Sequence, residues 1–137
     1  SKIAQIKGTE DALLLASGFQ ANVSVLSALL DPLYLKKTPL VFADRAIHAS
    51  MHQACRLAGV RQIRFHHQDM SHLEERLKKY ASFSNPKFIL VESLYGMEGS
   101  VTPLQTVVEL SQKYGAFLYV DEAHATGVWG EYGAGFS

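Results

Sequence analysis

The sequence predicts an α/β fold in which helices flank a mostly parallel sheet. Short apolar runs alternate along the chain with segments whose apolar residues recur at helical spacing. Two of these runs, Phe88–Val91 and Ala116–Val120, are apolar at nearly every position, which is typical of strands that helices cover on both faces. The length of 137 residues suffices for one domain with a core of its own.

Five short apolar runs are the expected strands. Each is bounded by residues that favour turns, and each is too short for a typical helix. In chain order the expected strands are Ala12–Ala16, Leu40–Ala43, Gln62–Phe65, Phe88–Val91 and Ala116–Val120.

The helices between these strands are marked by their ends. One begins at Gly18, and another over Ile47–Ala58 is closed by Gly59, because glycine readily takes the left-handed conformation that ends a helix. Two further helix starts carry the capping-box pattern, a hydroxyl followed by a carboxylate or amide residue. The boxes are Ser71 with Glu74, and Thr102 with Gln105 around a first-turn Pro103, the second helix ending at Tyr114 before Gly115.

The composition excludes several classes of protein. Lys+Arg and Asp+Glu number 13 each, so the formal net charge is zero and no basic surface for nucleic acid is expected. The single cysteine, Cys55, excludes an internal disulfide, and its helical spacing among apolar residues indicates packing rather than a nucleophile. No apolar run is long enough to cross a bilayer, and no leader pattern is present. We therefore expect a cytoplasmic protein without nucleic-acid or membrane partners.

The segment Asp121-Glu122-Ala123-His124 follows a predicted strand directly. Ligands of such folds bind at the carboxyl ends of the strands, so the Asp121 and His124 side chains can converge on one ligand. A solvated turn is the alternative, but an unpaired carboxylate beside a buried strand costs free energy. The same four letters occur in nucleic-acid-dependent ATPases, yet the phosphate loop that such enzymes need is absent from the sequence.

Other predicted strand ends carry further candidate ligand-binding residues. Gly18 and Phe19 open a helix, where N–H groups and the helix dipole favour a phosphate. The flat imidazole of His48 can stack on a planar ring, although a helix-capping histidine is the simpler interpretation. Glu92 is another polar group expected to face the site.

A small cluster of possible metal ligands stands apart from these positions. Nitrogen and oxygen side chains of this kind can hold a divalent metal. We favour a polar loop before a helix and predict no metal site there. The cluster comprises His66, His67, Asp69 and His72.

Four separated segments, residues 17–22, 44–50, 92–99 and 120–127, occur together in a characteristic order. In this order they resemble the α-oxoamine synthase family of pyridoxal-phosphate enzymes. The resemblance extends from residue 7 to residue 135. It implies that residues 1–137 are part of the cofactor-binding large domain of the aspartate-aminotransferase type of fold.

The resemblance also implies roles for individual residues in binding pyridoxal 5'-phosphate. The backbone of Gly18 and Phe19 would hold the phosphate, and His48 would stack on the pyridine ring. Asp121 would pair with the ring nitrogen and His124 with the phenolic oxygen, so His48, Asp121 and His124 are the candidate catalytic residues.

The implied reaction is a decarboxylative condensation of an amino acid with an acyl thioester, carried on coenzyme A or an acyl carrier, in a homodimer. L-alanine with a pimeloyl thioester is the preferred pair, and relatives that use glycine or serine remain alternatives.

Three departures from the family pattern qualify this expectation. Gly96 stands where many relatives have a serine, and Ala134 stands where an arginine is common. The family's Schiff-base lysine is expected after Ser137, because no lysine of the sequence follows a predicted strand near the motifs. We therefore expect residues 1–137 alone to be inactive, with weak, non-covalent cofactor binding at most.

Overall fold

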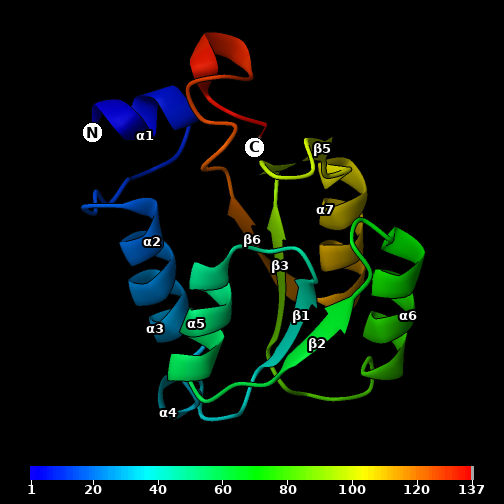
Figure 1. The fold of residues 1–137 in the computed structure, drawn as a ribbon. Helices are drawn as coiled ribbons and strands as arrows, with labels where there is room; N and C mark the ends of the chain where they lie inside the picture. Colours follow the sequence, from blue (N-terminus) through cyan, green and yellow to red (C-terminus); the bar gives the residue numbers. More distant parts are fainter. Residues whose placement is uncertain (137) are drawn as a thin grey trace.

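A four-stranded parallel sheet with the order β2-β1-β3-β6 forms the centre of the molecule (Figure 1). The computed structural model describes residues 1–136. The strands are β1 (Leu40–Asp44), β2 (Gln62–Phe65), β3 (Lys87–Glu92) and β6 (Ala116–Asp121). Because all of them run the same way, their carboxyl ends share one edge, where Glu92 is in register with Asp121. The predicted parallel sheet is confirmed.

Helices cover both faces of this sheet, with α2, α3 and α5 on one side and α6 and α7 on the other (Figure 1). The segments α2, η1 and α3 follow one another without a break, and the middle one is a π-helix. The α-helices are α1 (Lys2–Lys7), α2 (Gly18–Ala21), α3 (Ser27–Leu29), α4 (Pro32–Leu35), α5 (Ala49–Leu57), α6 (Met70–Lys79) and α7 (Leu104–Tyr114). The remaining elements are η1 (Asn22–Leu26), the 3₁₀ turn η2 (Glu131–Gly133) and the antiparallel hairpin of β4 (Leu94–Tyr95) and β5 (Ser100–Val101).

Two apolar layers hold the helices against the sheet. One layer packs α5 and the α2–α3 segment on the sheet through Leu26, Leu30, Met51, Val41 and Leu90. The other packs α6 and α7 through Leu73, Leu77, Val107, Phe42 and Ile89. Cys55 lies in the first layer, and burial raises the pKa of its thiol, so the predicted packing role is confirmed.

The two fully apolar strands differ in their surroundings. β3 lies between β1 and β6 and is buried along its whole length. Within the described residues β6 pairs only with β3, and Phe117 on it is 65% exposed. Apolar composition therefore predicted an interior strand correctly for β3 but not, in this chain, for β6.

The expected strand over Ala12–Ala16 is wrong. Its backbone is irregular, and Leu13 and Leu14 are 79% and 80% exposed. A strand needs a neighbouring backbone to complete its hydrogen bonds, and no described strand pairs with this segment.

Both predicted capping boxes are also wrong. The N-cap of α6 is Asp69, whose carboxylate accepts from the backbone N–H of His72 at 2.9 Å, and Ser71 lies inside the first turn. At α7 the hydroxyl of Thr102 donates to the Glu92 carbonyl at 2.6 Å, and Pro103 is the N-cap instead of the first helical residue. At α6 the helix starts earlier than the pattern assumes, and at α7 a strand carbonyl takes the hydroxyl that the pattern assigned to the helix start.

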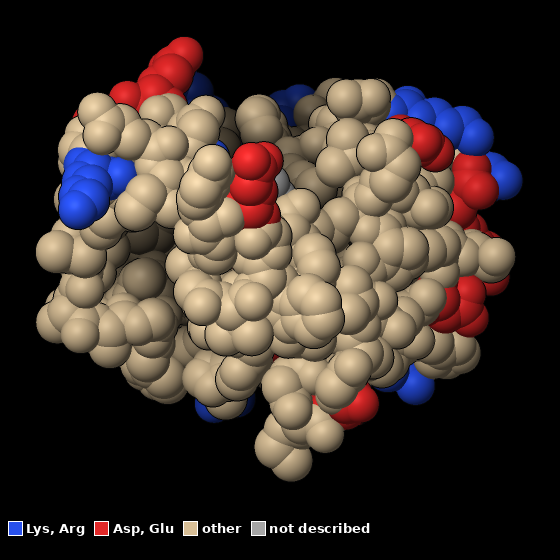
Figure 2. Space-filling model, turned by 90° about the horizontal axis from the view of Figure 1, so that it is seen from above, with Lys and Arg blue, Asp and Glu red and all other residues tan. Residues whose placement is uncertain are grey.

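Figure 2 shows the molecule from above, the side toward which the parallel strands point. In this view the lysine and arginine side chains lie at the margin and form no continuous patch, as the balanced charge predicts. Among residues 1–136, no helix has both the length and the apolar character that a membrane span requires.

Candidate active site

The residues predicted to bind a ligand surround one cavity at the carboxyl edge of the sheet. Its volume is about 210 Å³. The lining residues are Gly18, Phe19, Asn22, His48, Glu92, Asp121, Ala123 and His124. Every site residue predicted from the sequence is therefore among them, although these residues come from four separated segments. Their individual roles stay predictions.

The α2 start lines this cavity with Gly18 and Phe19. Ser17 caps the helix, and its Oγ accepts from the backbone N–H of Gln20 at 3.1 Å. The first N–H groups of a helix have no partner within it, so those of Gly18 and Phe19 are suited to an anion. A Cβ added at Gly18 would meet nothing within 4 Å, so the space in front of this helix start is open.

His48 combines the two interpretations that its sequence position allowed. It is the N-cap of α5, and its Nδ1 accepts from the backbone N–H of Ser50 at 3.2 Å. Its ring also lines the cavity, edge-on to Phe19 with 6.3 Å between the ring centroids. Capping orients the imidazole without removing it from the site.

The carboxylate of Asp121 is held from two sides. Its Oδ2 accepts from Nδ2 of Asn22 at 2.7 Å, and its Oδ1 accepts from the backbone N–H of Ala123 at 2.9 Å. Asn22 is 6% exposed, and the sequence analysis did not single it out. The available signal was its place one turn after Gly18, on the same helical segment.

Glu92 brings a second carboxyl to the same cavity. It is 6% exposed and lies opposite Asp121 in the strand register. Burial, together with the charge of Asp121, raises the pKa of Glu92 to about 7, against the pull of a hydrogen bond from the His48 backbone. The proton on Glu92 is therefore held more tightly than on an ordinary glutamate.

His124 lies over the bare backbone of Gly96. A Cβ added at Gly96 would stand 2.6 Å from Cε1 of His124, a distance that carbon atoms without a bond between them do not adopt. The glycine therefore makes room for the imidazole in its present position.

A comparison with known families agrees with this arrangement. The model of the family "Aminotransferase class I and II" matches residues 1–135. The chain belongs to this aminotransferase family. Named relatives place it among the α-oxoamine synthases, as the sequence motifs predicted.

Three of these relatives illustrate the similarity. The 8-amino-7-oxononanoate synthase of Gluconacetobacter diazotrophicus is 50% identical over 139 residues, which cover 100% of this chain and 35% of the relative. A serine palmitoyltransferase from S. paucimobilis with bound PLP has a TM-score of 0.87 at 31% identity, over 97% of this chain and 32% of its own. The 8-amino-7-oxononanoate synthase from Francisella tularensis has a TM-score of 0.79 at 29% identity, over 98% and 36%. The chain thus spans about a third of the length of its relatives.

No lysine of residues 1–136 lies at the carboxyl end of a strand, as expected, but one lysine approaches the motifs from a helix. Lys7 of α1 forms an ion pair with Glu122, and both line a second cavity of about 780 Å³ beside Asp121. Glu122 also accepts from the backbone N–H of Phe136 at 2.7 Å. The pattern of strand ends could not reveal Lys7, because it reaches the site from a helix. Its amine is bound in the ion pair, whereas a Schiff-base lysine needs a free amine.

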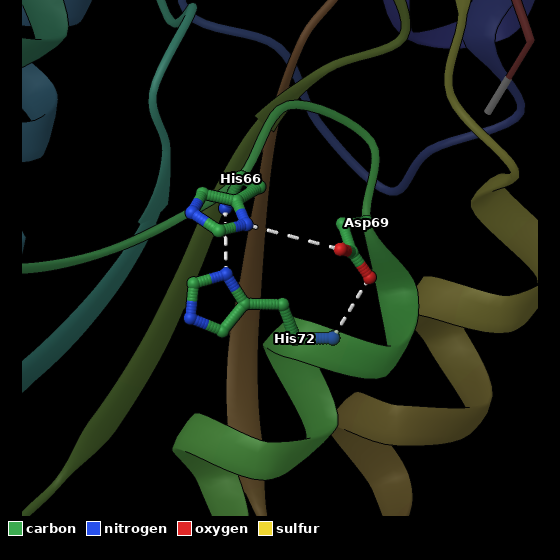
Figure 3. A group of neighbouring side chains, drawn as sticks. All are labelled: His66, Asp69 and His72. Atoms are coloured by element: carbon green, nitrogen blue, oxygen red, sulfur yellow. Dashed lines mark hydrogen bonds and ion pairs between the residues drawn. The ribbon is translucent and has the colours of Figure 1, made fainter.

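The cluster of possible metal ligands, for which no metal site was predicted, is divided by the structure. His66, Asp69 and His72 stay together, with 4.1 Å between the two ring centroids and 3.9 Å between Nδ1 of His66 and the Asp69 carboxylate (Figure 3). Both ring nitrogens of His72 already face N–H donors, from the His66 backbone at 3.1 Å and from Arg76 at 3.0 Å. A cation there would have to displace the positive Arg76, so we retain the polar helix start and propose no metal. His67 points elsewhere, toward Asp44.

Proposed function

We propose that this protein is a pyridoxal-phosphate-dependent acyltransferase that condenses L-alanine with a pimeloyl thioester, with loss of carbon dioxide, to form 8-amino-7-oxononanoate for biotin synthesis. The observation that carries the proposal is the convergence of Gly18, Phe19, His48, Asp121 and His124 on one cavity. The names of the 8-amino-7-oxononanoate synthase relatives support the choice of substrates.

The groups around the cavity fit pyridoxal phosphate chemically. A helix start with free N–H groups suits the phosphate, a flat imidazole suits the ring face, and an ionised aspartate suits the protonated ring nitrogen. Asp121 accepts hydrogen bonds at both oxygens, which fix the orientation of its carboxylate beside the cavity. When bound, the cofactor supplies an electron sink that stabilises a carbanion at the α-carbon of an amino acid.

Each of these residues would then have a defined task. Gly18 and Phe19 would bind the phosphate, and His48 would pack on the ring. Asp121 would keep the proton on the ring nitrogen, and His124 would donate to the phenolic oxygen. A protonated Glu92 adds no second negative charge beside Asp121.

Other α-oxoamine synthases remain the alternative, because a serine palmitoyltransferase is also similar to the chain. Such enzymes would pair glycine or serine with another acyl thioester. The expected setting is a cytoplasmic homodimer, which the resemblance implies. Exposed apolar side chains such as Leu13, Leu33 and Phe117 support an assembly that covers them.

A product assay with the full-length protein tests the proposal. Alanine, glycine, serine and threonine are each incubated with pimeloyl-CoA, acetyl-CoA and palmitoyl-CoA, and the aminoketone products are identified by mass spectrometry. We expect the highest turnover with alanine and pimeloyl-CoA. Higher turnover with another amino acid and acyl-CoA would mean that this other pair is the natural substrate pair. The absence of product with every pair would overturn the proposed activity.

A further inference from the structure

We propose that Asn22 is the positioning residue of this site, because its one amide group orients both Asp121 and His48. The inference rests on the proposed function only for the identity of the ligand, pyridoxal phosphate, that Asp121 and His48 would contact in the cavity. The hydrogen bonds themselves are properties of the chain. Asn22 begins the π-helical segment η1, a rare widening of the helix that recurs at functional sites.

Asn22 makes three side-chain hydrogen bonds, all of them to other elements. Its Oδ1 accepts from the hydroxyl of Tyr119 at 2.9 Å. Its Nδ2 donates to Asp121 at 2.7 Å and to Ser50 at 2.9 Å. The amide thus joins the α2–α3 segment to β6 and α5, and its two N–H bonds and its carbonyl are all in use.

The direction of each bond follows from the chemistry of the partners. A neutral tyrosine hydroxyl can donate, and burial and the Asp121 charge raise the pKa of Tyr119 to about 12, so it keeps its proton. Reversing the amide would turn its carbonyl oxygen toward the Asp121 carboxylate, where two acceptors would repel each other. Asn22 is therefore held with its NH₂ group toward Asp121.

A consequence follows for the protonation of His48. Because Ser50 Oγ accepts from Asn22, its own hydroxyl proton is free to donate to Nδ1 of His48, 2.7 Å away. The backbone N–H of Ser50 also points to Nδ1, at 3.2 Å. A neutral imidazole that accepts at Nδ1 carries its proton on Nε2. Two donors of Ser50, its backbone N–H and its hydroxyl, therefore hold His48 as the Nε2–H tautomer, and Asn22 orients the hydroxyl.

The test reads the His48 tautomer by ¹⁵N NMR in the full-length, cofactor-free protein labelled at histidine, at a pH where the ring is neutral. The variant His48→Gln identifies the resonances. We expect the Nε2–H tautomer in the parent protein. We expect a fraction of the Nδ1–H form in Asn22→Ala, because the Ser50 hydroxyl can then rotate to accept from the ring and only the longer backbone N–H contact still favours an unprotonated Nδ1. Asn85→Ala is the matched control, since Asn85 donates only to the exposed Thr38 carbonyl and its loss leaves the His48 signals unchanged.

A second readout is the affinity for pyridoxal phosphate, which we expect to fall about tenfold in Asn22→Ala. If Asn22→Ala does not fold, the variant Ser50→Ala tests the inference instead. It removes the hydroxyl that donates to Nδ1 of His48 and leaves the rest of the segment unchanged. An unchanged His48 tautomer in a folded variant would overturn the inference. The NMR result does not depend on activity, so a protein without product but with the expected tautomer shift refutes only the proposed function.

Discussion

Two aspartates end strands of the same sheet, and each is linked to a histidine and a serine. Asp44 ends β1, and its carboxylate is bound to His67 at 2.9 Å, with Ser100 on the far nitrogen of that ring at 2.9 Å. Asp121 ends β6 and is linked to Ser50 and His48 through Asn22. We call these sets the Asp44 network and the Asp121 network.

The two networks differ in how fully the carboxylate is used. Asp44 is 1% exposed and also accepts from the backbone N–H groups of Ala46 at 2.8 Å and Gln68 at 2.9 Å. Asp121 has two hydrogen bonds within the described residues and lines both cavities, neither of which Asp44 lines. A carboxylate with all its lone pairs in use stabilises the fold, whereas one with acceptor capacity left beside a cavity can bind a ligand.

This difference also explains why we assign no catalytic role to the Asp44 network. Its carboxylate, imidazole and hydroxyl stand in the order found in serine hydrolases. They connect the end of β1, the loop after β2 and the β4–β5 hairpin, so the bonds fasten three segments together. We therefore assign the Asp44 network a structural role.

The largest expected effect comes from breaking the Asp44 network. Asp44→Ala leaves two backbone N–H groups and His67 without their acceptor, so we expect the free energy of unfolding to fall by about 3 to 5 kcal/mol. Urea unfolding of the full-length protein measures it, with the exposed Asp11→Ala as control. A loss below about 1 kcal/mol would contradict the structural role.

Breaking the Asp121 network should act on binding instead. We expect Asp121→Asn to weaken pyridoxal-phosphate binding about 100-fold, roughly 3 kcal/mol, because a charge-assisted hydrogen bond is lost. The free energy of unfolding should change by less than about 1 kcal/mol. An absorbance titration gives the affinity for pyridoxal phosphate. An affinity equal to that of the parent protein would show that Asp121 does not contribute to cofactor binding.

Glu92 sharpens the comparison through pH. Its pKa of about 7 in the folded state lies above the ordinary 4.5, so the folded state binds the proton more tightly. The resulting stabilisation is complete below pH 4.5 and is lost as the pH rises through 7. We expect this group to lower the free energy of unfolding by about 2 kcal/mol between pH 5 and 8, and Glu92→Gln to remove that change. If the free energy of unfolding depended on pH equally in the parent protein and in Glu92→Gln, the pH dependence would come from other groups.

The smallest expected effect concerns Gly96. A serine there would push the His124 ring out of its position, so we expect Gly96→Ser to weaken cofactor binding by less than about tenfold, under 1.4 kcal/mol. The matched control is Gly99→Ser in the same turn, which meets nothing within 4 Å and changes only backbone strain. An effect on affinity from Gly99→Ser of the same size would show that the turn acts as a whole.

Much of the site was visible in the sequence because three of its four motifs lie at the ends of strands. Asp121, His48 and Glu92 are placed by the strands before them, and parallel strands bring such ends to one edge. The capping boxes failed for the opposite reason. The Thr102 hydroxyl found the Glu92 carbonyl, and Asp69 capped α6 ahead of Ser71.

The sequence by itself determined the four strands of the parallel sheet, most helices and the edge at which the motifs gather, since apolar periodicity and chain breakers act over short distances. Only the tertiary structure decided which polar groups meet. Asn22 and Asp121 are 99 residues apart, and His67 and Ser100 are 33 apart. No local pattern encodes such pairs. The folded core sets their distances, and those distances decide whether an aspartate at a strand end supports the fold or faces a ligand.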